Sequence, residues 1–547
     1  MYIKKIRIEN FKGFKGIFSL ELNEGLNILV GDNEAWKSTI LEAIHLILSG
    51  MLNGKYLKNE LTQYLFNSEI VAEYLDSLLK KTPLMPPHIL IEIFIGGPSL
   101  PMFEWTHNSD KTSECGFHLN LCMSDKYLAE YATLIKSGCD IKTLPIEYFD
   151  FCIKSFAGTE ITPRFMPIKS ALIDSSSNRY QNGSDIYISR IVRELLGPQE
   201  IIDVSQAHRR MKEWFMAESS IAAINVRLNT AAGISDKRVT LSVDLSSKNA
   251  WENSLVTYLD DIPFHYIGKW EQCIVKTKLA LENKKTKDAH LILLEEPENH
   301  LSHTKLNQLI YEIRTKGTGK QIIVSTHSSF VANKLGLENL VLLSDKKTIR
   351  LRDLNPDTQE FFQKIPGYDT LRLILCKKAI LVEGDCDELI IQKAYMNNNS
   401  QKLPIDEGID VISVWTSFLR FLEIAEKINK PTVVVTDNDG NVTGLEEKYE
   451  EYLGTKAKKN IKICFDNVVD TWALTIGKLA KPFNYNTLEP KLLKVNGLSL
   501  LSKILGLTIS EDDLHRYMKA HKTECALKMF NTTESIKFPD YILEAIK

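Results

Sequence analysis

The 547-residue sequence contains no apolar run of the roughly 18 residues that a transmembrane helix needs. Its nine cysteines are scattered and no CxxC pair occurs, which argues against a zinc knuckle or a disulfide framework. The opening residues, MYIKKIRIENFKGF, alternate apolar and polar positions and predict a first strand rather than a signal peptide. These absences predict a reduced, cytoplasmic protein with no membrane partner.

The sequence also lacks an excess of basic residues, since 67 Lys and Arg stand against 70 Asp and Glu. The resulting charge of −3 neither supports nor excludes nucleic-acid binding, because clustered cations matter more than their sum. The run Lys456–Lys462 is one such cluster, although runs of this kind are more often a solvated surface. No Gly/Ser-rich linker occurs, so closely packed domains are expected.

The segment 31–39, GDNEAWKST, follows the apolar strand 26–30 and opens a helix with apolar residues in a 3.6-residue period. A phosphate-binding P-loop needs this context, because backbone N–H groups and a helix N-terminus attract phosphate. Lys37 would reach the β- and γ-phosphates and Ser38 would hold Mg²⁺. Trp36 stands where the motif has Gly, and alone the segment is equally typical of an ordinary strand–helix turn. The candidate nucleotide-binding residues are Gly31, Asn33, Lys37, Ser38 and Thr39.

Two further apolar strands end in polar residues. The strand 291–294 runs into Glu295 and Glu296, the form of a Walker B strand, in which Glu295 lies near Mg²⁺ and Glu296 polarises water. The strand 321–325 is followed by His327, a candidate contact of the γ-phosphate. Each has a plainer interpretation, because acids at a strand end are often solvated and a lone His is more often structural.

A second α/β pattern begins near residue 373, and acids follow two of its apolar strands, 379–382 and 432–435. Because α/β sheets place their sites at the C-terminal ends of strands, these acids are expected to share one edge. Clustered carboxylates repel unless cations neutralise them, and hard oxygen ligands favour Mg²⁺ or Mn²⁺ over zinc. The metal-ligand candidates are Glu383, Asp387, Asp437 and Asp439.

The segment Asp437–Gly440, DNDG, is also a good turn sequence and resembles the start of an EF-hand loop. Val442 and Lys448 stand where an EF-hand needs Gly and Glu, so the EF-hand is rejected.

Together the nucleotide motifs resemble the ABC-type ATPases of the RecF, SMC and OLD (overcoming lysogenisation defect) group. The opening Ile6–Phe14 adds to this likeness. Gly268–Gln272 resembles the ABC signature loop, which caps a nucleotide bound to a partner subunit. The Glu-Gly and Asp-x-Asp segments resemble a Toprim domain, and the whole arrangement resembles the OLD family.

Three smaller features also resemble OLD nucleases. Asp387 and Glu388 supply the extra acid after the Toprim Glu. By the same resemblance Lys522 is a catalytic lysine that stabilises the pentavalent phosphate. The segment Asn486–Glu489 is similar too, but Glu489 has no assigned role.

The resemblance implies an α/β fold: an ABC-type ATPase domain with a helical dimerisation insert, a Rossmann-like Toprim domain, and a helical C-terminal segment that completes the nuclease site. The expected boundaries are 1–165 and 236–370 for the ATPase domain, 166–235 for the insert, 371–480 for the Toprim domain and 481–547 for the C-terminal part.

The implied function is ATP-regulated cleavage of DNA by two Mg²⁺ or Mn²⁺ ions, with ATP and Mg²⁺ in the ATPase domain. The implied partners are DNA, a second copy of the chain, and defence-system proteins or retron RNA–DNA, since the family acts in bacterial defence against phage. One alternative is a non-catalytic ATP clamp of the RecF/SMC kind. Another is a primase-type nucleotidyl transferase.

Tryptophan occurs at several positions where these motifs have Gly: Trp36, Trp270, Trp415 and, on a weaker match, Trp105. An indole at position 36 would occupy the phosphate space or force the loop open. The ATP site is therefore either degenerate, or these codons were misassigned, because UGA differs from the Gly codon GGA by one base.

Overall fold

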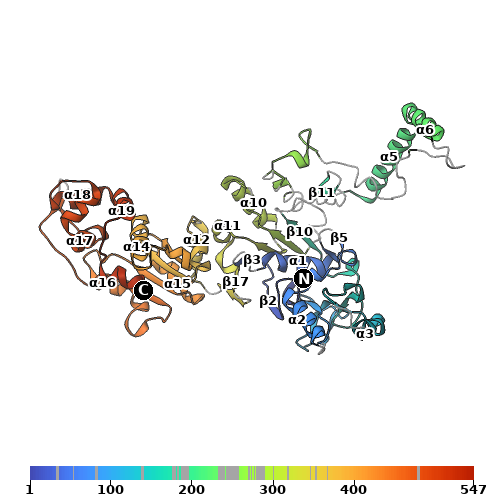
Figure 1. Ribbon diagram of the computed structural model, residues 1–547, viewed down its shortest axis with the longest axis horizontal. Coiled ribbons are helices and arrows are strands. Elements are labelled where there is room, and N and C mark those ends of the chain that lie inside the picture. Colours follow the sequence, from blue (N-terminus) through green and yellow to red (C-terminus); the bar gives the residue numbers. More distant parts are fainter. Residues whose placement is uncertain are drawn as a thin grey trace. The chain divides into compact units, whose positions relative to one another are not determined.

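The computed structural model divides the chain into two compact units (Figure 1). The first comprises Met1–Thr326 with Asp345–Thr348, and the second comprises His327–Ser344 with Ile349–Lys547. The structure describes residues 1–31, 36–52, 55–80, 84–136, 141–174, 180–181, 184–185, 196–231, 241, 258–268, 271–272, 274–275, 278, 290–299, 301–316, 319–344, 347–351, 354–365, 367–476 and 481–547.

An antiparallel sheet begins the first unit, with strand order β2-β1-β6-β8-β7 and β9 paired to β8. Its first strand is the one predicted from the opening residues, and it buries Ile3, Ile6 and Ile8 on one face. The strands are β1 (Tyr2–Glu9), β2 (Ile17–Glu21), β6 (Ile89–Gly96), β7 (Glu104–Trp105), β8 (Glu114–Met123) and β9 (Phe149–Ser155).

A parallel sheet in the same unit places β10, β15, β16 and β3 side by side in that order. Its central strands are continuous apolar runs, as expected of parallel strands covered on both faces. The side chain of Gln321 bonds both backbone groups of Ile3 at 2.8 Å and so ties β16 to β1. The bounds are β3 (Leu26–Gly31), β10 (Ser170–Asp174), β15 (Leu291–Glu295) and β16 (Gln321–Ser325), with α1 (Lys37–Ser49) and α10 (His303–Lys316).

The region expected to be a helical insert contains α5 (Pro198–Ala217) and α6 (Ser219–Ala231). Residues 186–195 of the expected helix and most of the expected strand 237–245 lie outside the described residues. The other helices of the first unit include α2 (Ser68–Leu79) and α3 (Leu128–Lys136). Within the described part of the chain, no helix is long and apolar enough to cross a membrane.

The second unit is built on a four-stranded parallel sheet with the order β20-β19-β21-β22. Helices follow the strands in the alternation expected of an α/β domain. The strands are β19 (Lys378–Val382), β20 (Ile409–Ser413), β21 (Thr432–Val435) and β22 (Ile461–Cys464). The helices are α11 (Ser329–Leu335), α12 (Pro356–Lys364), α13 (Thr370–Leu375), α14 (Asp385–Asn398), α15 (Phe418–Lys427) and α16 (Val442–Lys448).

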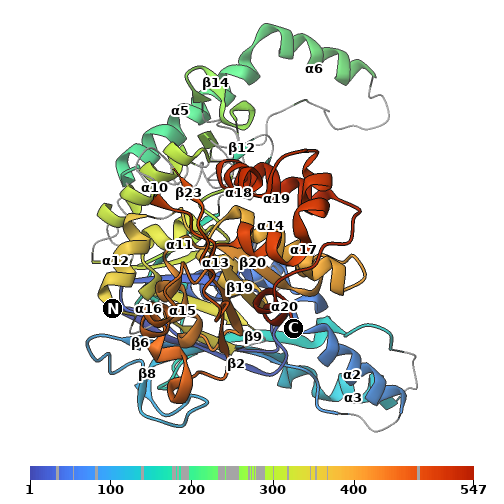
Figure 2. The same ribbon diagram turned by 90° about the vertical axis from the view of Figure 1, so that its left-hand side faces the viewer.

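The C-terminal residues are helical, as the sequence predicts, and they share one apolar core with the sheet and α14. Figure 2 shows α17, α18 and α19 gathered around α14. A left-handed Gly497 interrupts α17. The helices are α17 (Leu488–Leu505), α18 (Glu511–Ala520), α19 (Lys522–Asn531) and α20 (Asp540–Ala545). This core places the start of α17 and the start of α19 beside the sheet edge that carries the acids.

Candidate functional site

The phosphate-binding candidates that the structure describes lie at the end of β3 and in the first turn of α1. Lys37 is buried and its Nζ donates to the Gly31 carbonyl at 2.8 Å. Ser38 and Thr39 follow in the first turn of α1, directly after the loop from β3. Asn33 lies outside the described residues.

Trp36 occupies a left-handed backbone conformation, with φ of 52°, at the N-cap of α1. Its indole packs edge-on against Phe14 at 5.3 Å between ring centroids. It also fills the space beside Gly13, where a Cβ atom would meet the indole at 2.2 Å. The left-handed region costs a non-Gly residue about 1–2 kcal/mol, so the backbone here has the conformation that favours glycine.

The Walker B candidates end β15, which neighbours β16 at the same edge of the parallel sheet. Glu295 is the last residue of β15. Glu296 has a φ of 42°, and its carboxylate accepts from the Asn299 side chain at 2.6 Å. The parallel strands β15 and β3, with β16 between them, thus bring Glu295 and Gly31 to the same end of the sheet.

Of the remaining nucleotide candidates, His327 comes two residues after the end of β16. His327 is exposed and is the first residue of the second compact unit. Gly268 is described, whereas Trp270 of the expected signature loop lies outside the described residues.

In the second unit, the acids lie at the C-terminal ends of two adjacent strands. Glu383 follows β19, and Asp437 and Asp439 follow β21. Asp387 is the third residue of α14, and its carboxylate accepts from the Gly384 N–H at 3.0 Å. This capping contact turns Asp387 back toward the end of β19.

Backbone and side-chain donors hold the two acids of the Asp-x-Asp segment. The carboxylate of Asp437 accepts from the Leu488 N–H at 3.1 Å, at the start of α17. The Asn484 side chain donates to Asp439 at 2.8 Å. The chain segment before α17 therefore reaches both acids.

The carboxylates raise one another's pKa, as a cluster of like charges must. Desolvation by burial, followed by repulsion from Asp387, raises the pKa of Asp437 well above its usual value. Burial and repulsion from Glu489 raise the pKa of Asp387 to about 7. Desolvation and Asp439 raise the pKa of Glu383. A cation that relieved this repulsion would bind favourably.

Glu489, to which the sequence assigned no role, belongs to this cluster. It is 5 % exposed, and its carboxylate pairs with the Lys522 Nζ at 3.1 Å. Burial opposes protonation of Lys522, but Glu489 outweighs it and raises the pKa of the lysine. Lys522 is thereby held as a cation beside Asp437 and Asp387.

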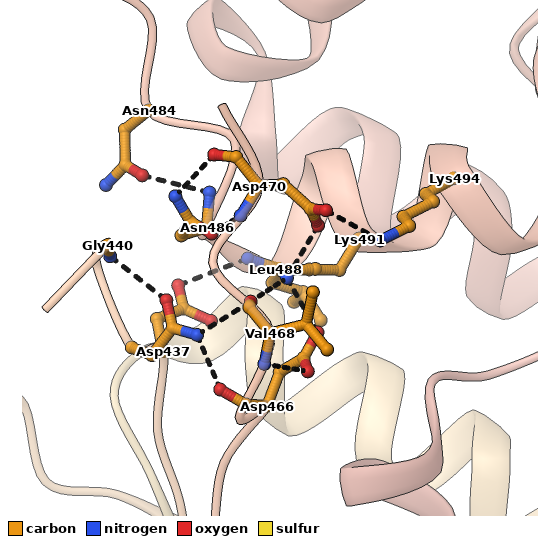
Figure 3. Close-up of polar contacts among 11 residues, drawn as sticks. Asp437, Gly440, Asp466, Val468, Asp470, Asn484, Asn486, Leu488, Lys491 and Lys494 are labelled. Carbon is orange, nitrogen blue, oxygen red and sulfur yellow. Dashed lines mark hydrogen bonds and ion pairs between the residues drawn. The ribbon is translucent and has the colours of Figure 1, made fainter. Parts of the chain in front are cut away.

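A buried lysine of α17 holds the loop after β22, and Asn438 of the Asp-x-Asp segment bonds the same loop (Figure 3). Lys491 is 3 % exposed, and its Nζ lies 2.6 Å from Asp466, 2.7 Å from Asp470 and 2.8 Å from the Val468 carbonyl. The Asn438 side chain donates to that same carbonyl at 3.1 Å. One buried cation therefore fixes the loop on which the Asp-x-Asp segment rests.

The Asn486 side chain completes this network through Asp470. Asn486 accepts from the Asp470 N–H at 2.7 Å and donates to its carbonyl at 3.0 Å.

Glu388 does not bond this network, since its carboxylate pairs with Arg372 at 3.5 Å. Arg372 also bonds Asp410 at 2.6 Å, so this extra acid braces α13, α14 and β20.

The donor set suits a hard divalent cation, since every candidate ligand is a carboxylate oxygen. Among the described residues, no three His, Cys, Asp or Glu side chains are grouped closely enough to hold a metal ion as they stand. The contacts explain this spacing: Asp387, Asp437 and Asp439 each accept a local hydrogen bond, and Glu489 pairs with Lys522. Cation binding would require these side chains to rotate and exchange those contacts for the metal.

Two protein families match the chain at the two candidate sites. Residues 1–83 match the AAA ATPase domain family, a stretch that includes Trp36 and Lys37. Residues 374–439 match the TOPRIM domain of overcoming lysogenization defect protein-like proteins, a stretch that includes all four acids of the Glu-Gly and Asp-x-Asp segments.

The chain is also similar to curated and solved proteins. It is 27% identical over 156 residues to a structural maintenance of chromosomes protein 3 homolog of Plasmodium falciparum (isolate 3D7), covering 26% of this chain and 12% of that protein. It is 32% identical over 75 residues to the DNA replication and repair protein RecF of Clostridium novyi (strain NT), covering 14% and 20%. The chain thus spans a fifth or less of the length of these relatives. The SMC head domain from Thermotoga maritima shares 13% identity, with a TM-score of 0.28, over 64% of this chain and 97% of that one.

Proposed function

Because the chain joins an AAA ATPase domain to an OLD-like Toprim domain, we propose that it is an ATP-regulated, divalent-metal-dependent DNA endonuclease. The observation that carries the proposal is the cluster of Glu383, Asp387 and Asp437 beside the cation Lys522, with the pKa of each acid raised by burial and by its neighbours. Metal-dependent release of cut DNA without added nucleotides tests it and separates a nuclease from a nucleotidyl transferase.

Divalent cations held by Glu383, Asp387, Asp437 and Asp439 would supply Lewis acidity and an activated water at the scissile phosphate. The chain's own groups orient this chemistry. The Leu488 N–H fixes Asp437, and the Lys491 network holds the loop below it. Lys522 offers a positive charge to the phosphate, and Glu489 keeps that charge protonated and in place.

The ATPase unit would regulate this site. Lys37, Ser38 and Thr39 would bind ATP with Mg²⁺, Glu295 would lie near that Mg²⁺, and Glu296 would polarise water. His327 would contact the γ-phosphate. Closing of two ATPase units on ATP would gate access of DNA to the nuclease. The OLD-like arrangement supports a role in anti-phage defence in the cytoplasm, beside defence partners.

A non-catalytic, ATP-gated DNA clamp is the second candidate. The similarity to the RecF protein of C. novyi favours it, because that protein's name assigns it to DNA replication and repair. The clamp requires no acid cluster, so loss of cleavage on removal of an acid would separate the two functions.

Lys522→Ala should lower the cleavage rate by roughly 100- to 1,000-fold and leave Mn²⁺ affinity nearly unchanged, because the lysine acts on the transition state. Lys522→Arg, which keeps the charge next to Glu489, should retain more activity. Single-turnover rates and Mn²⁺ titration measure the two effects. An equal loss of metal binding would make Lys522 a structural residue.

The metal-free protein should lose stability as pH rises from about 4 to about 7. The pKa of Asp387 is about 7 in the fold against 3.8 in the unfolded chain, so the folded state holds a proton that the unfolded state releases. Over the same range Mn²⁺ should bind more tightly, because it competes with that proton. Thermal unfolding in EDTA and Mn²⁺ titration at pH 5 and pH 8 measure both trends. If the metal-free protein is more stable at pH 8 than at pH 5, the Asp387→Asn variant decides the cause. A gain that this variant loses would contradict the repulsion argument, whereas a gain that it keeps would come from other groups.

The protein should be at least a homodimer, since a signature loop caps a nucleotide only from a second subunit. The helix α5 exposes Met211, Trp214 and Phe215 at positions three and four residues apart, an apolar face that a second copy would cover. Phe215→Glu should therefore weaken the dimer, whereas Tyr311→Glu, at an exposed ring on α10, should not. Light scattering at micromolar protein with ATP measures the mass. A wild-type monomer under these conditions would count against the ABC-type arrangement.

A further inference from the structure

An exposed tryptophan lies on the loop that the buried lysine anchors, four residues after Val468. Trp472 is 63 % exposed and lies two residues after Asp470, which bonds Lys491 and Asn486. Val468, on the same loop, accepts from Asn438 between the two acids of the Asp-x-Asp segment. Four residues of chain span at most about 14 Å, so the indole lies within reach of a nucleotide strand on the acids.

A buried aromatic cluster holds the indole in place. Trp472 contacts Tyr485 edge to face, with ring centroids 5.2 Å apart and planes at 80°. Tyr485 is buried and packs against Phe483 at 4.9 Å and His515 at 5.0 Å. A ring mounted on such a base loses little conformational freedom when a ligand stacks on it.

The surroundings of the indole suit a nucleic-acid strand. Val468 and Val469 are exposed on the same loop and extend its apolar surface. Lys519, an exposed residue of α18, places its ammonium 5.2 Å from the centre of the Phe483 ring. Aromatic rings that stack on bases beside cations for the backbone are the elements of single-strand binding. A fully paired duplex presents no free base face to such a ring.

Trp472 differs from the tryptophans at Gly-like positions. The backbone of Trp36 and of Trp415 is left-handed, with φ of 52° in each, whereas Trp472 is not among the residues with positive φ. Its conformation is one that an ordinary side chain adopts. The indole at 472 is therefore compatible with its backbone and available for function.

We propose that Trp472 is a stacking platform for an unpaired nucleobase next to the scissile phosphate, so that the site binds single-stranded or locally opened DNA in preference to paired duplex. The proposal rests on the proposed nuclease function and names the substrate class of that same site.

The test is binding of a fluorescent single-stranded oligonucleotide and of the same sequence fully paired, by anisotropy in EDTA, so that no cleavage occurs. Stacking is worth about 1–3 kcal/mol per base, so Trp472→Ala should weaken single-strand binding by about 5- to 100-fold and duplex binding far less. Trp472→Phe should retain most of the affinity, and Trp472→Leu, which keeps apolar packing, should not.

Trp105→Ala is the matched control, because it removes a 59 % exposed indole from the first unit. Equal weakening on single-stranded and paired DNA, or full affinity in Trp472→Leu, would overturn the stacking platform. A different result would contradict the proposed nuclease function: wild-type protein that binds these strands but cuts no DNA with Mg²⁺ or Mn²⁺. Wild-type protein that binds neither DNA in EDTA would overturn the stacking platform alone.

Discussion

An Asp437→Ala protein should cut no detectable plasmid DNA with Mg²⁺ or Mn²⁺, although it should fold at least as stably as the wild type. Asp437 is a candidate ligand at the centre of the cluster, and loss of a direct ligand should cost more than the roughly 10- to 100-fold lost with residues that only orient ligands. Burial, followed by repulsion from Asp387, raises the pKa of Asp437 and disfavours its charge in the metal-free fold. Removing it relieves that repulsion.

Glu447→Ala is the control for this variant, since it removes an exposed carboxylate from α16 in the same unit. It should leave plasmid cleavage and thermal unfolding unchanged. A folded Asp437→Ala protein that nicks plasmid at the wild-type rate would contradict the Toprim nuclease hypothesis. A large fall in the unfolding temperature in EDTA would instead show that the carboxylate stabilises the fold.

Trp36→Gly should raise ATP affinity more than tenfold over the chain as written, which should bind ATP poorly. The backbone at Trp36 is left-handed, which glycine adopts freely, so the substitution removes about 1–2 kcal/mol of strain. The substitution also removes the indole that would occupy the phosphate space or force the loop open. Isothermal titration with ATP and Mg²⁺ measures the affinity.

The matched comparisons are two other tryptophans. Trp415→Gly should stabilise the protein, because φ at Trp415 is also 52°. Trp105→Gly should not, because Trp105 lies in β7 and is not among the residues with positive φ. Tight ATP binding by protein confirmed by mass spectrometry to carry Trp36 would refute the steric argument. A native peptide whose mass shows Gly at 36 would establish codon misassignment.

Motifs at strand ends could be predicted from the sequence because their context is local. The strand Thr432–Val435 has the predicted bounds, and the acids after it meet Glu383 because parallel neighbours end at one edge. The roles of Glu489 and Lys491 could not be predicted in this way. Both residues lie in α17, but their partners lie in other parts of the chain. Glu489 pairs with Lys522 of α19, and Lys491 pairs with Asp466 and Asp470 of the loop after β22. Exposure to solvent is the ordinary expectation for a Glu and a Lys, since buried charges are rare unless paired.

The left-handed backbone at Trp36 shows a different limit. Sequence identifies a position where a motif has Gly, but only the fold shows whether the backbone conformation there favours it. Two of the suspected positions have that conformation, and Trp105 does not. Trp270, the fourth, lies outside the described residues.

The most direct test of the central claim is incubation of the purified full-length chain with supercoiled plasmid and Mg²⁺ or Mn²⁺, with and without ATP. The proposed function predicts nicked or linear product that requires the metal, disappears in EDTA and with Asp437→Ala, and changes in amount when ATP is present. Intact plasmid under every metal condition, or equal cleavage in EDTA, would contradict it.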